Sequence, residues 1–167
     1  DSISALGAVD LPMDKLGIDV LVTASQKAWM APPGIAMISV SPNAWDKHNT
    51  AMMPRYYFDL SMYKKFDEKN QTPATCAVST IYGLDHSLQM MRKAGMKNIF
   101  QKHVALTIHL RDGVRKMGLE LFVKDVDASH TVTSIKIPNG IDGHHWLKLL
   151  REKYNLILAG GMGETKG

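Results

Sequence analysis

The apolar positions in the first part of the chain predict two short strands joined by a rigid turn. Residues 18–23 (IDVLVT) and 35–40 (IAMISV) are short runs, mostly apolar and rich in β-branched side chains. Such runs are typical of strands that are buried on both faces of a sheet. Between them, residues 31–34 (APPG) are a strong turn signal. A short helix is expected over residues 10–17, and another is expected to begin at 41–43 (SPN).

Apolar residues at steps of three and four predict longer helices. The first extends from Thr72-Pro73 to about residue 93, and its apolar positions are Val78, Ile81, Tyr82, Leu84, Leu88 and Met91. Two more helices are expected over residues 97–117 and 142–154. Residues 54–70 follow no regular period, so we expect this segment to be mostly loop.

The pattern changes near residue 95. Beyond it, residues 119–124, 131–137 and 156–159 have the pattern of short strands. We therefore expect an α/β protein in two parts. Residues 1–95 form the first part, with a mostly parallel sheet, and residues 96–167 form a small α+β domain.

Composition and charge exclude several classes of protein. The 167 residues are 45% apolar and 22% charged, which is average for a globular protein and excludes a disordered tail. No apolar stretch is long enough for a membrane span, and the first residues lack the pattern of a signal peptide. The net charge of +4 is thinly spread, so no nucleic-acid partner is expected. The single Cys76 favours a reducing compartment such as the cytoplasm, and His144-His145 lack metal-ligand spacing.

The strongest candidate for chemistry is Lys27, which directly follows the predicted strand over residues 18–23. In open α/β sheets, ligands bind at the carboxyl ends of strands. Short neighbours, Ala24 and Ala28, leave room for partial desolvation of the amine, which would make it a usable nucleophile or Schiff-base former. On these features alone, a surface lysine in a strand–loop connection is the more common explanation.

Two further segments strengthen the case for a cofactor site. Asp1 supplies a carboxylate among small and apolar residues, and Thr72 and Thr75 place hydroxyls at the start of a predicted helix, where anions bind readily. A carboxylate, an amine and an anion cradle are the groups that pyridoxal phosphate requires. Together they favour a pyridoxal-phosphate site.

The runs DSISALG and DVLVTASQKAWMAPPG closely resemble the class V aminotransferases, within the alanine–glyoxylate, serine–glyoxylate and serine–pyruvate branch. The segments SVSPNAWDKH, PRYYFDL and TPATCAVSTIYGL also resemble the cyanobacterial soluble hydrogenase small subunit, which is in the same branch. The resemblance covers essentially the whole chain. It implies a type I pyridoxal-phosphate transferase fold, present as an internal fragment with part of the cofactor-binding domain and an incomplete small domain.

The resemblance also implies residue roles. Lys27 would bind pyridoxal 5'-phosphate as a Schiff base and move the proton at the substrate α-carbon. Asp1 would pair with the pyridine nitrogen, Ile3 would pack against the ring, and Gln26 would bind the phosphate or its surroundings.

The resemblance further implies that Thr75, and less specifically Thr72, reach the cofactor phosphate of a neighbouring subunit. The expected assembly is therefore a homodimer with shared active sites. The family's glycine-rich phosphate loop and its substrate-binding arginine are absent from these 167 residues, which leaves the exact substrates in doubt.

The implied reaction is transfer of an amino group from a small amino acid, alanine or serine, to a 2-oxo acid, glyoxylate or pyruvate. Two alternatives stay open. The first is a non-catalytic, hydrogenase-associated subunit or binding protein that retains the fold. The second is a cysteine desulfurase-like lyase, which fits less well because those enzymes usually have histidine at Gln26 and need a mobile-loop cysteine, a context that Cys76 lacks.

Overall fold

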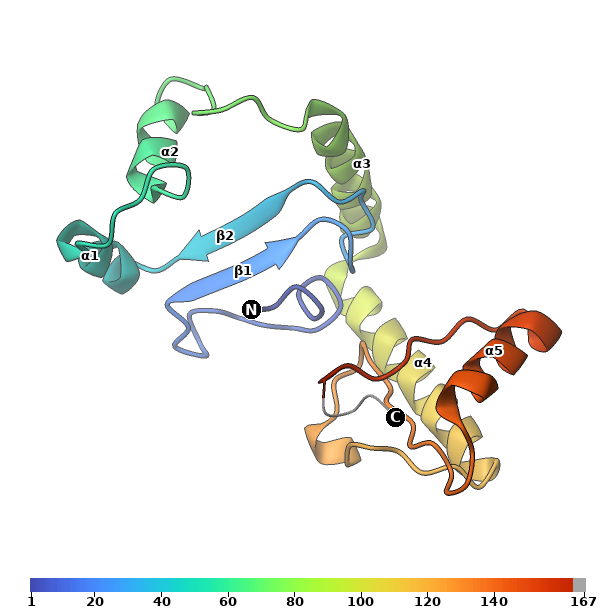
Figure 1. Cartoon of the computed structure of the whole chain (residues 1–167). Helices are drawn as coiled ribbons and strands as arrows, with labels where there is room; N and C mark the ends of the chain where they lie inside the picture. The colour runs from blue at the N-terminus through green and yellow to red at the C-terminus, as the bar shows by residue number, and fades with distance from the viewer. Residues whose placement is uncertain (164–167) are drawn as a thin grey trace. The chain divides into compact units, whose positions relative to one another are not determined.

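The computed structural model describes residues 1–163, and Glu164–Gly167, the last four residues of the predicted small domain, lie outside the described residues. The chain divides into two compact units, Asp1–Gln101 and Lys102–Gly167. The division lies within helix α4 (Met96–Lys116), which is shown with the other elements in Figure 1. Each unit is described separately below.

The first unit is built on a pair of strands, β1 (Val20–Ala24) and β2 (Ala36–Val40). Both strands were predicted, but they pair antiparallel, with Val20 opposite Val40 (Figure 1). The expected parallel arrangement therefore does not arise between these two strands. The physical reason is their connection, residues 25–35, which contains no helix and is too short for the crossover that a parallel pair requires.

The residues at the N-terminus lie beside β1. Both the backbone N–H and the hydroxyl of Ser2 donate to the carbonyl oxygen of Val22, at 2.9 and 2.8 Å. Residues 10–17 form turns and not the predicted helix, because Gly17, with φ of +64°, follows a single helical turn between Pro12 and Leu16.

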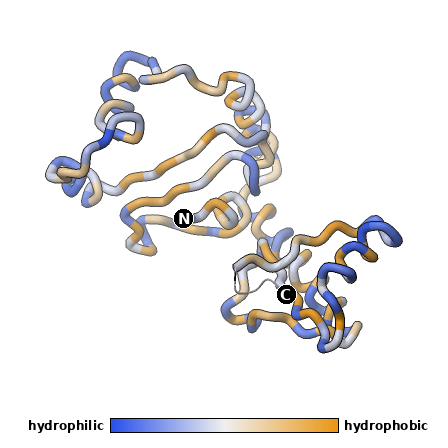
Figure 2. Tube along the Cα trace, in the orientation of Figure 1, coloured by the Kyte–Doolittle hydropathy of each residue, from blue (hydrophilic) through white to orange (hydrophobic). Residues whose placement is uncertain are grey.

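Strand β1 is covered on one face only, although burial on both faces is expected from its sequence. Leu21 and Thr23 are buried, whereas Val20 is 47% exposed. Hydrophobic residues extend along much of β1 in Figure 2. Because successive side chains of a strand alternate between its faces, Leu21 and Thr23 lie on the buried face, and Val20 lies on the other face with the half-buried Val22 and Ala24.

Two short helices follow the sheet. Helix α1 (Pro42–Thr50) begins as predicted, with the Ser41 hydroxyl accepting from the Ala44 N–H at 3.1 Å. Helix α2 (Leu60–Asp67) lies where a loop was predicted. Its signal is the N-cap Asp59, whose carboxylate accepts from the Ser61 N–H at 3.0 Å and so satisfies a backbone donor at the start of the helix.

Helix α3 (Val78–Ala94) and helix α4 confirm two predicted helices, but α3 begins later than expected. Thr72 donates from its hydroxyl to the carbonyl of Ala74 at 2.8 Å, a local bond that competes with helix formation. Thr72 and Thr75 therefore precede the helix and do not lie at its N-terminus. Gly95, with φ of +82°, ends α3.

The second unit contains most of α4, the 3₁₀ helix η1 (Asp125–Asp127) and α5 (Gly143–Tyr154). The predicted helix over 142–154 is confirmed, with Asp142 as its N-cap. The backbone N–H groups of His145 and His144 donate to this carboxylate and lower its pKa.

Strands predicted in the second unit are absent from the described residues. Residues 119–124 and 131–137 meet only at an isolated antiparallel bridge between Leu121 and Ile135, and residues 156–159 have no regular structure. A strand requires a partner along its whole length, and the described chain supplies one only at this bridge.

The chain has a small core for its size. Its buried hydrophobic residues are Ala8, Leu21, Ala31, Leu84, Met91 and Val114. Several apolar positions that were predicted to face a core, including Ile81 and Tyr82 on α3, are exposed. The described residues therefore leave much apolar surface uncovered.

A carboxylate ties the start of β1 to the start of α1. Asp19 accepts from the Ser41 hydroxyl at 2.6 Å and from the Asn43 amide at 3.1 Å, and these hydrogen bonds lower its pKa. We expect Asp19→Asn to lower the free energy of unfolding at pH 7. The effect should shrink as the pH falls below the usual carboxyl range, because stabilisation by a carboxylate with a lowered pKa is lost on protonation.

Urea unfolding at a series of pH values measures this difference. Asp14→Asn is the matched control, since Asp14 is exposed and lies in the turn before β1. An Asp19→Asn difference that is the same at pH 3 and pH 7 would contradict the assignment.

Candidate active site

Ser25 organises the connection that carries Lys27. This serine is fully buried at the end of β1. Its N–H donates to the carbonyl of Ile35 at 3.0 Å, and its carbonyl accepts from the Ala31 N–H at 3.0 Å. Its hydroxyl donates to the carbonyl of Pro32 at 2.6 Å and accepts from the Ile35 N–H at 3.4 Å. Both ends of the connection are thus fixed to one residue.

Lys27 lies on a tight turn within this connection. Its carbonyl accepts from the Met30 N–H at 2.9 Å, and Met30 has φ of +56°, an uncommon conformation for a residue other than glycine. Lys27 and Gln26 are both exposed. The partial desolvation predicted for Lys27 is therefore wrong for the described residues, because its alanine neighbours are too short to cover the amine.

The N-terminal segment that carries Asp1 and Ile3 packs, at Gly7, against the connection that carries Lys27. Asp1 accepts from the Ile3 N–H at 2.7 Å, which orients its exposed carboxylate. Gly7 has φ of +96°, and a Cβ built on it would lie 3.2 Å from Ala28 Cβ and 3.4 Å from Trp29 Cδ2. Only glycine permits this close approach without strain. The structure therefore brings together the segments that bear Asp1 and Lys27.

Helix α3 supports the other side of the Lys27 connection. Three residues at one face of the helix meet three residues of the connection: Thr80 near Gly34, Gly83 near Pro32, and Ser87 bonded to Trp29. A Cβ built on Gly83 would lie 3.2 Å from Pro32 Cδ. The small side chains on this face let the Pro-Pro-Gly turn lie directly against the helix.

Thr72 and Thr75 lie apart from this cluster in the contacts of the described residues. Both are exposed on the segment between α2 and α3. The Thr72 hydroxyl bonds locally to Ala74. Neither threonine has a hydrogen bond to the Lys27 connection among the described residues, so the structure does not place an anion cradle beside Lys27 within one chain.

Sequence reasoning missed the residues that hold the site in place. Ser25, Gly7 and Ser87 bear no obvious reactive group, and each acts through close packing or a buried hydrogen bond. The available signal was the rigid 31–34 turn, which follows Lys27 and precedes the second strand. Its backbone polar groups need hydrogen-bond partners, which small polar side chains nearby can supply.

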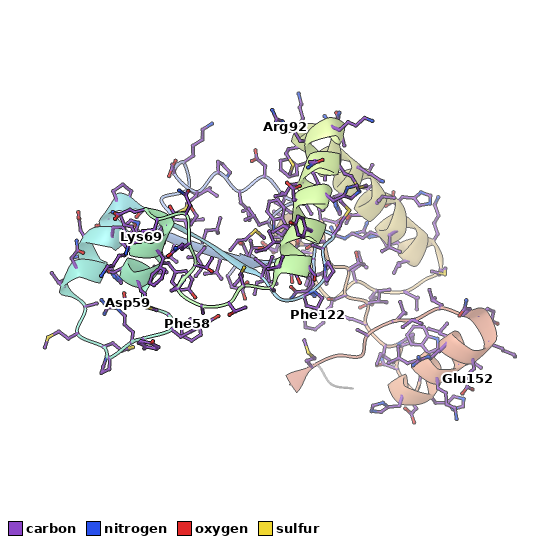
Figure 3. The ribbon with its side chains drawn as sticks, turned by 90° about the horizontal axis from the view of Figure 1, so that it is seen from above. Phe58, Asp59, Lys69, Arg92, Phe122 and Glu152 are labelled. Atoms are coloured by element: carbon purple, nitrogen blue, oxygen red, sulfur yellow. The ribbon has the colours of Figure 1, made fainter. Side chains whose placement is uncertain are left out.

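A second polar cluster lies between α1 and α2. His48 Nε2 is 2.6 Å from the Ser61 hydroxyl and 3.4 Å from Asp59 Oδ1. Because both partners lie at the same ring nitrogen, the imidazole does not pass a proton from one to the other through its second nitrogen. Burial acts to raise the pKa of Asp59, but the Ser61 N–H and the Arg55 guanidinium outweigh it and lower the pKa. Figure 3 shows Asp59 and the neighbouring Phe58 near the start of α2. This cluster fixes the α1–α2 connection.

The described residues contain neither a cluster of metal ligands nor a membrane-spanning helix. No group of three or more histidine, cysteine, aspartate or glutamate side chains is arranged to hold a metal ion in residues 1–163. Over the same residues, no helix combines the length and apolar character needed to cross a bilayer.

Comparison with known proteins identifies the family. The family model "Aminotransferase class-V" matches residues 1–164 of this chain. The chain belongs to the class V aminotransferase family. Among the relatives of this class V chain, the soluble hydrogenase small subunit of Synechococcus sp. (strain PCC 6716) is 38% identical over the whole chain and 43% of the relative. The L-aspartate–glyoxylate aminotransferase of Paracoccus denitrificans is 33% identical over the whole chain and 42% of the relative.

Solved structures confirm the fold of this class V chain. The alanine–glyoxylate aminotransferase of Nostoc sp. matches all of the chain and 45% of that protein, with a TM-score of 0.92 and 26% identity. The fold is therefore that of the type I pyridoxal-phosphate aminotransferases, as predicted. The class V chain spans less than half the length of the relatives that it matches.

Pyridoxal phosphate is the cofactor that this family implies, and the residues present fit it. A primary amine (Lys27) is exposed on a turn fixed by Ser25, and a carboxylate (Asp1) is exposed on the segment packed beside it. These are the two charged groups that a pyridine aldehyde requires. Half-buried Ile3 supplies an apolar surface on the same segment as Asp1.

The Gly7 contact can be tested by adding a single methyl group. We expect Gly7→Ala to destabilise the protein by about 2–4 kcal/mol, because it combines a positive φ with an overpacked contact. Gly17→Ala is the matched control: Gly17 also has positive φ, but no atom lies within 4 Å of its added Cβ, and we expect a loss of about 1 kcal/mol. Urea unfolding compares the two, and equal losses would contradict the close packing.

Proposed function

We propose that this chain supplies the lysine-bearing part of a pyridoxal-phosphate aminotransferase that moves an amino group from alanine or serine to glyoxylate or pyruvate. The observation that carries the proposal is the packing of the N-terminal segment, which bears the Asp1 carboxylate, at Gly7 against Ala28 and Trp29 of the connection that bears the Lys27 amine. Family membership supports the reaction type. Glyoxylate as acceptor is supported by the names of the Paracoccus and Nostoc relatives.

Each residue has a distinct task in this proposal. When bound, pyridoxal phosphate withdraws electrons from the substrate α-carbon. Lys27 would hold the cofactor as a Schiff base, and once released its Nζ would take the proton from that carbon and deliver it to the cofactor's C4′, as amino transfer requires. Asp1 keeps a proton on the pyridine nitrogen through charge pairing, while Ile3 packs against the ring and Gln26 binds the phosphate or its surroundings.

A second copy of the chain completes the site in this proposal. Thr72 and Thr75 are exposed and make no hydrogen bond to the Lys27 connection among the described residues. In this proposal Thr75 reaches the cofactor phosphate of a partner subunit, and Thr72 does so once its hydroxyl leaves the Ala74 carbonyl. The large uncovered apolar surface is consistent with a homodimer.

We also propose the domain organisation and the compartment. Residues 1–95 belong to the large cofactor-binding domain, and residues 96–167 belong to the small domain. The two compact units support a division in this region. Cys76, the single cysteine, supports the cytoplasm as the compartment.

Borohydride reduction tests the proposal directly. We expect reduction of the protein, purified at its natural length, to fix one pyridoxyl group on Lys27, located by peptide mapping. Lys27→Arg keeps the charge but cannot form the imine, so it should carry no label and should lose at least a thousandfold in transamination rate. Exposed Lys15→Arg is the control and should keep both. Absence of the label on Lys27 in the wild type would refute the proposal.

Substrate choice is a separate measurement. We expect ¹⁵N from labelled alanine or serine to appear in glycine when glyoxylate is supplied, because both donors have small side chains. Transfer from neither donor to glyoxylate or pyruvate would remove this substrate assignment, even with Lys27 labelled.

One relative favours a second candidate function. The Synechococcus protein is named as a hydrogenase subunit and is 38% identical to this chain, so a non-catalytic subunit that retains the fold is the alternative. Co-purification with a redox partner and no cofactor absorbance would favour it. The third candidate function is that of a cysteine desulfurase-like lyase. Cys76 precedes α3 and is half-buried, and release of sulfide from cysteine would be required to support it.

A further inference from the structure

Trp29 contacts every element that positions the candidate site. Its indole Nε1 donates to the Thr23 hydroxyl in β1 at 3.2 Å. Its carbonyl accepts from the Ser87 hydroxyl in α3. Its ring faces Gly7, where an added Cβ would lie 3.4 Å from Cδ2. One side chain and its peptide therefore meet the strand before Lys27, helix α3, and Gly7 of the N-terminal segment that also carries Asp1.

The two hydroxyl groups that hydrogen-bond to Trp29 belong to buried residues. Thr23 is 2% exposed and Ser87 is 4% exposed. Buried hydroxyls cannot exchange these partners for water, so breaking either bond leaves a polar group unsatisfied. Trp29 lies two residues after Lys27, within the turn closed by the Met30 N–H and the Lys27 carbonyl. A change in the position of Trp29 therefore changes the direction in which Lys27 leaves the turn.

The same ring also limits the position of the Asp1 turn. Ser2 fixes that turn to Val22 of β1, and Gly7 packs against Ala28 and Trp29. The segment that carries Asp1 and the connection that carries Lys27 therefore both contact β1, and the segment also contacts Trp29 of the connection.

We propose that Trp29 is a positioning residue that couples the placement of Lys27 to that of Asp1 through its bond to Thr23. The inference rests on the proposed function, since the two groups must meet one cofactor. Trp29 touches neither the cofactor nor the substrate in this proposal. It sets the distance between the amine and the carboxylate, and so it affects cofactor affinity and the protonation of the bound cofactor.

The test uses four forms of the protein at its natural length: wild type, Trp29→Phe, Thr23→Val and the double variant. Phenylalanine keeps a ring against Gly7 but lacks the indole N–H, and valine keeps the shape of threonine but lacks the acceptor. We expect each single variant to weaken pyridoxal-phosphate binding about tenfold, the effect of losing one buried hydrogen bond. The double variant should be within about twofold of the worse single variant, because both remove the same bond.

A spectroscopic readout separates positioning from stability. The pH midpoint at which the visible absorbance of the bound cofactor changes should shift in both single variants, since this midpoint depends on the charged groups around the cofactor. Trp146→Phe, the same substitution in α5, is the control and should leave affinity and midpoint unchanged. Melting temperatures are recorded for all forms.

Three outcomes would overturn the inference: unchanged affinity and midpoint in both single variants, fully multiplicative losses in the double variant, or lowered melting temperatures with an unshifted midpoint. Failure of the proposed function gives a different result, because the wild-type protein itself would then carry no pyridoxyl group on Lys27 after reduction.

Discussion

The buried hydrogen bonds of Ser25 are the interaction on which the rest of the site depends. Residues 25–35 have no regular secondary structure, so their backbone groups need other partners. Ser25 provides them to Ala31, Pro32 and Ile35 from a single fully buried position at the end of β1. The turn with Lys27 is thereby closed at its base, and its outer side is free to pack against the Asp1 turn and α3. A flexible connection could not hold an amine in a fixed direction.

The uncovered apolar surface is the second physical constraint. Large apolar side chains on β1, β2 and α3 are exposed to water among the described residues, including Val20, Ile38 and Ile81, and their exposure is unfavourable. The rigid part of the site, around Ser25 and Trp29, is packed within the first unit. By contrast, Thr72 and Thr75 are exposed.

The sequence predicted the elements that carry strong local signals. The two strands, the APPG turn and the helices over 97–117 and 142–154 follow from apolar periodicity, proline and the Asp142 cap. The antiparallel pairing of β1 with β2 was not predicted, and the strands predicted in the second unit do not form in the described residues, because pairing depends on partners distant in sequence. Helix α2 was missed since its cap, Asp59, lies in an aromatic segment. Lys27 and Asp1 were identified by their chemistry and by family resemblance, whereas Gly7, Ser25 and Ser87 could be identified only from packing.

Lys27 and Asp1 act on the same cofactor in this proposal, because the segments that carry them pack together at Gly7. The most direct measurement is a crystal structure of the protein at its natural length after loading with pyridoxal phosphate. We expect continuous electron density from Lys27 Nζ to the cofactor, with the Asp1 carboxylate at hydrogen-bonding distance from the pyridine nitrogen. Cofactor bound at another lysine, or bound with its pyridine nitrogen away from Asp1, would contradict the claim.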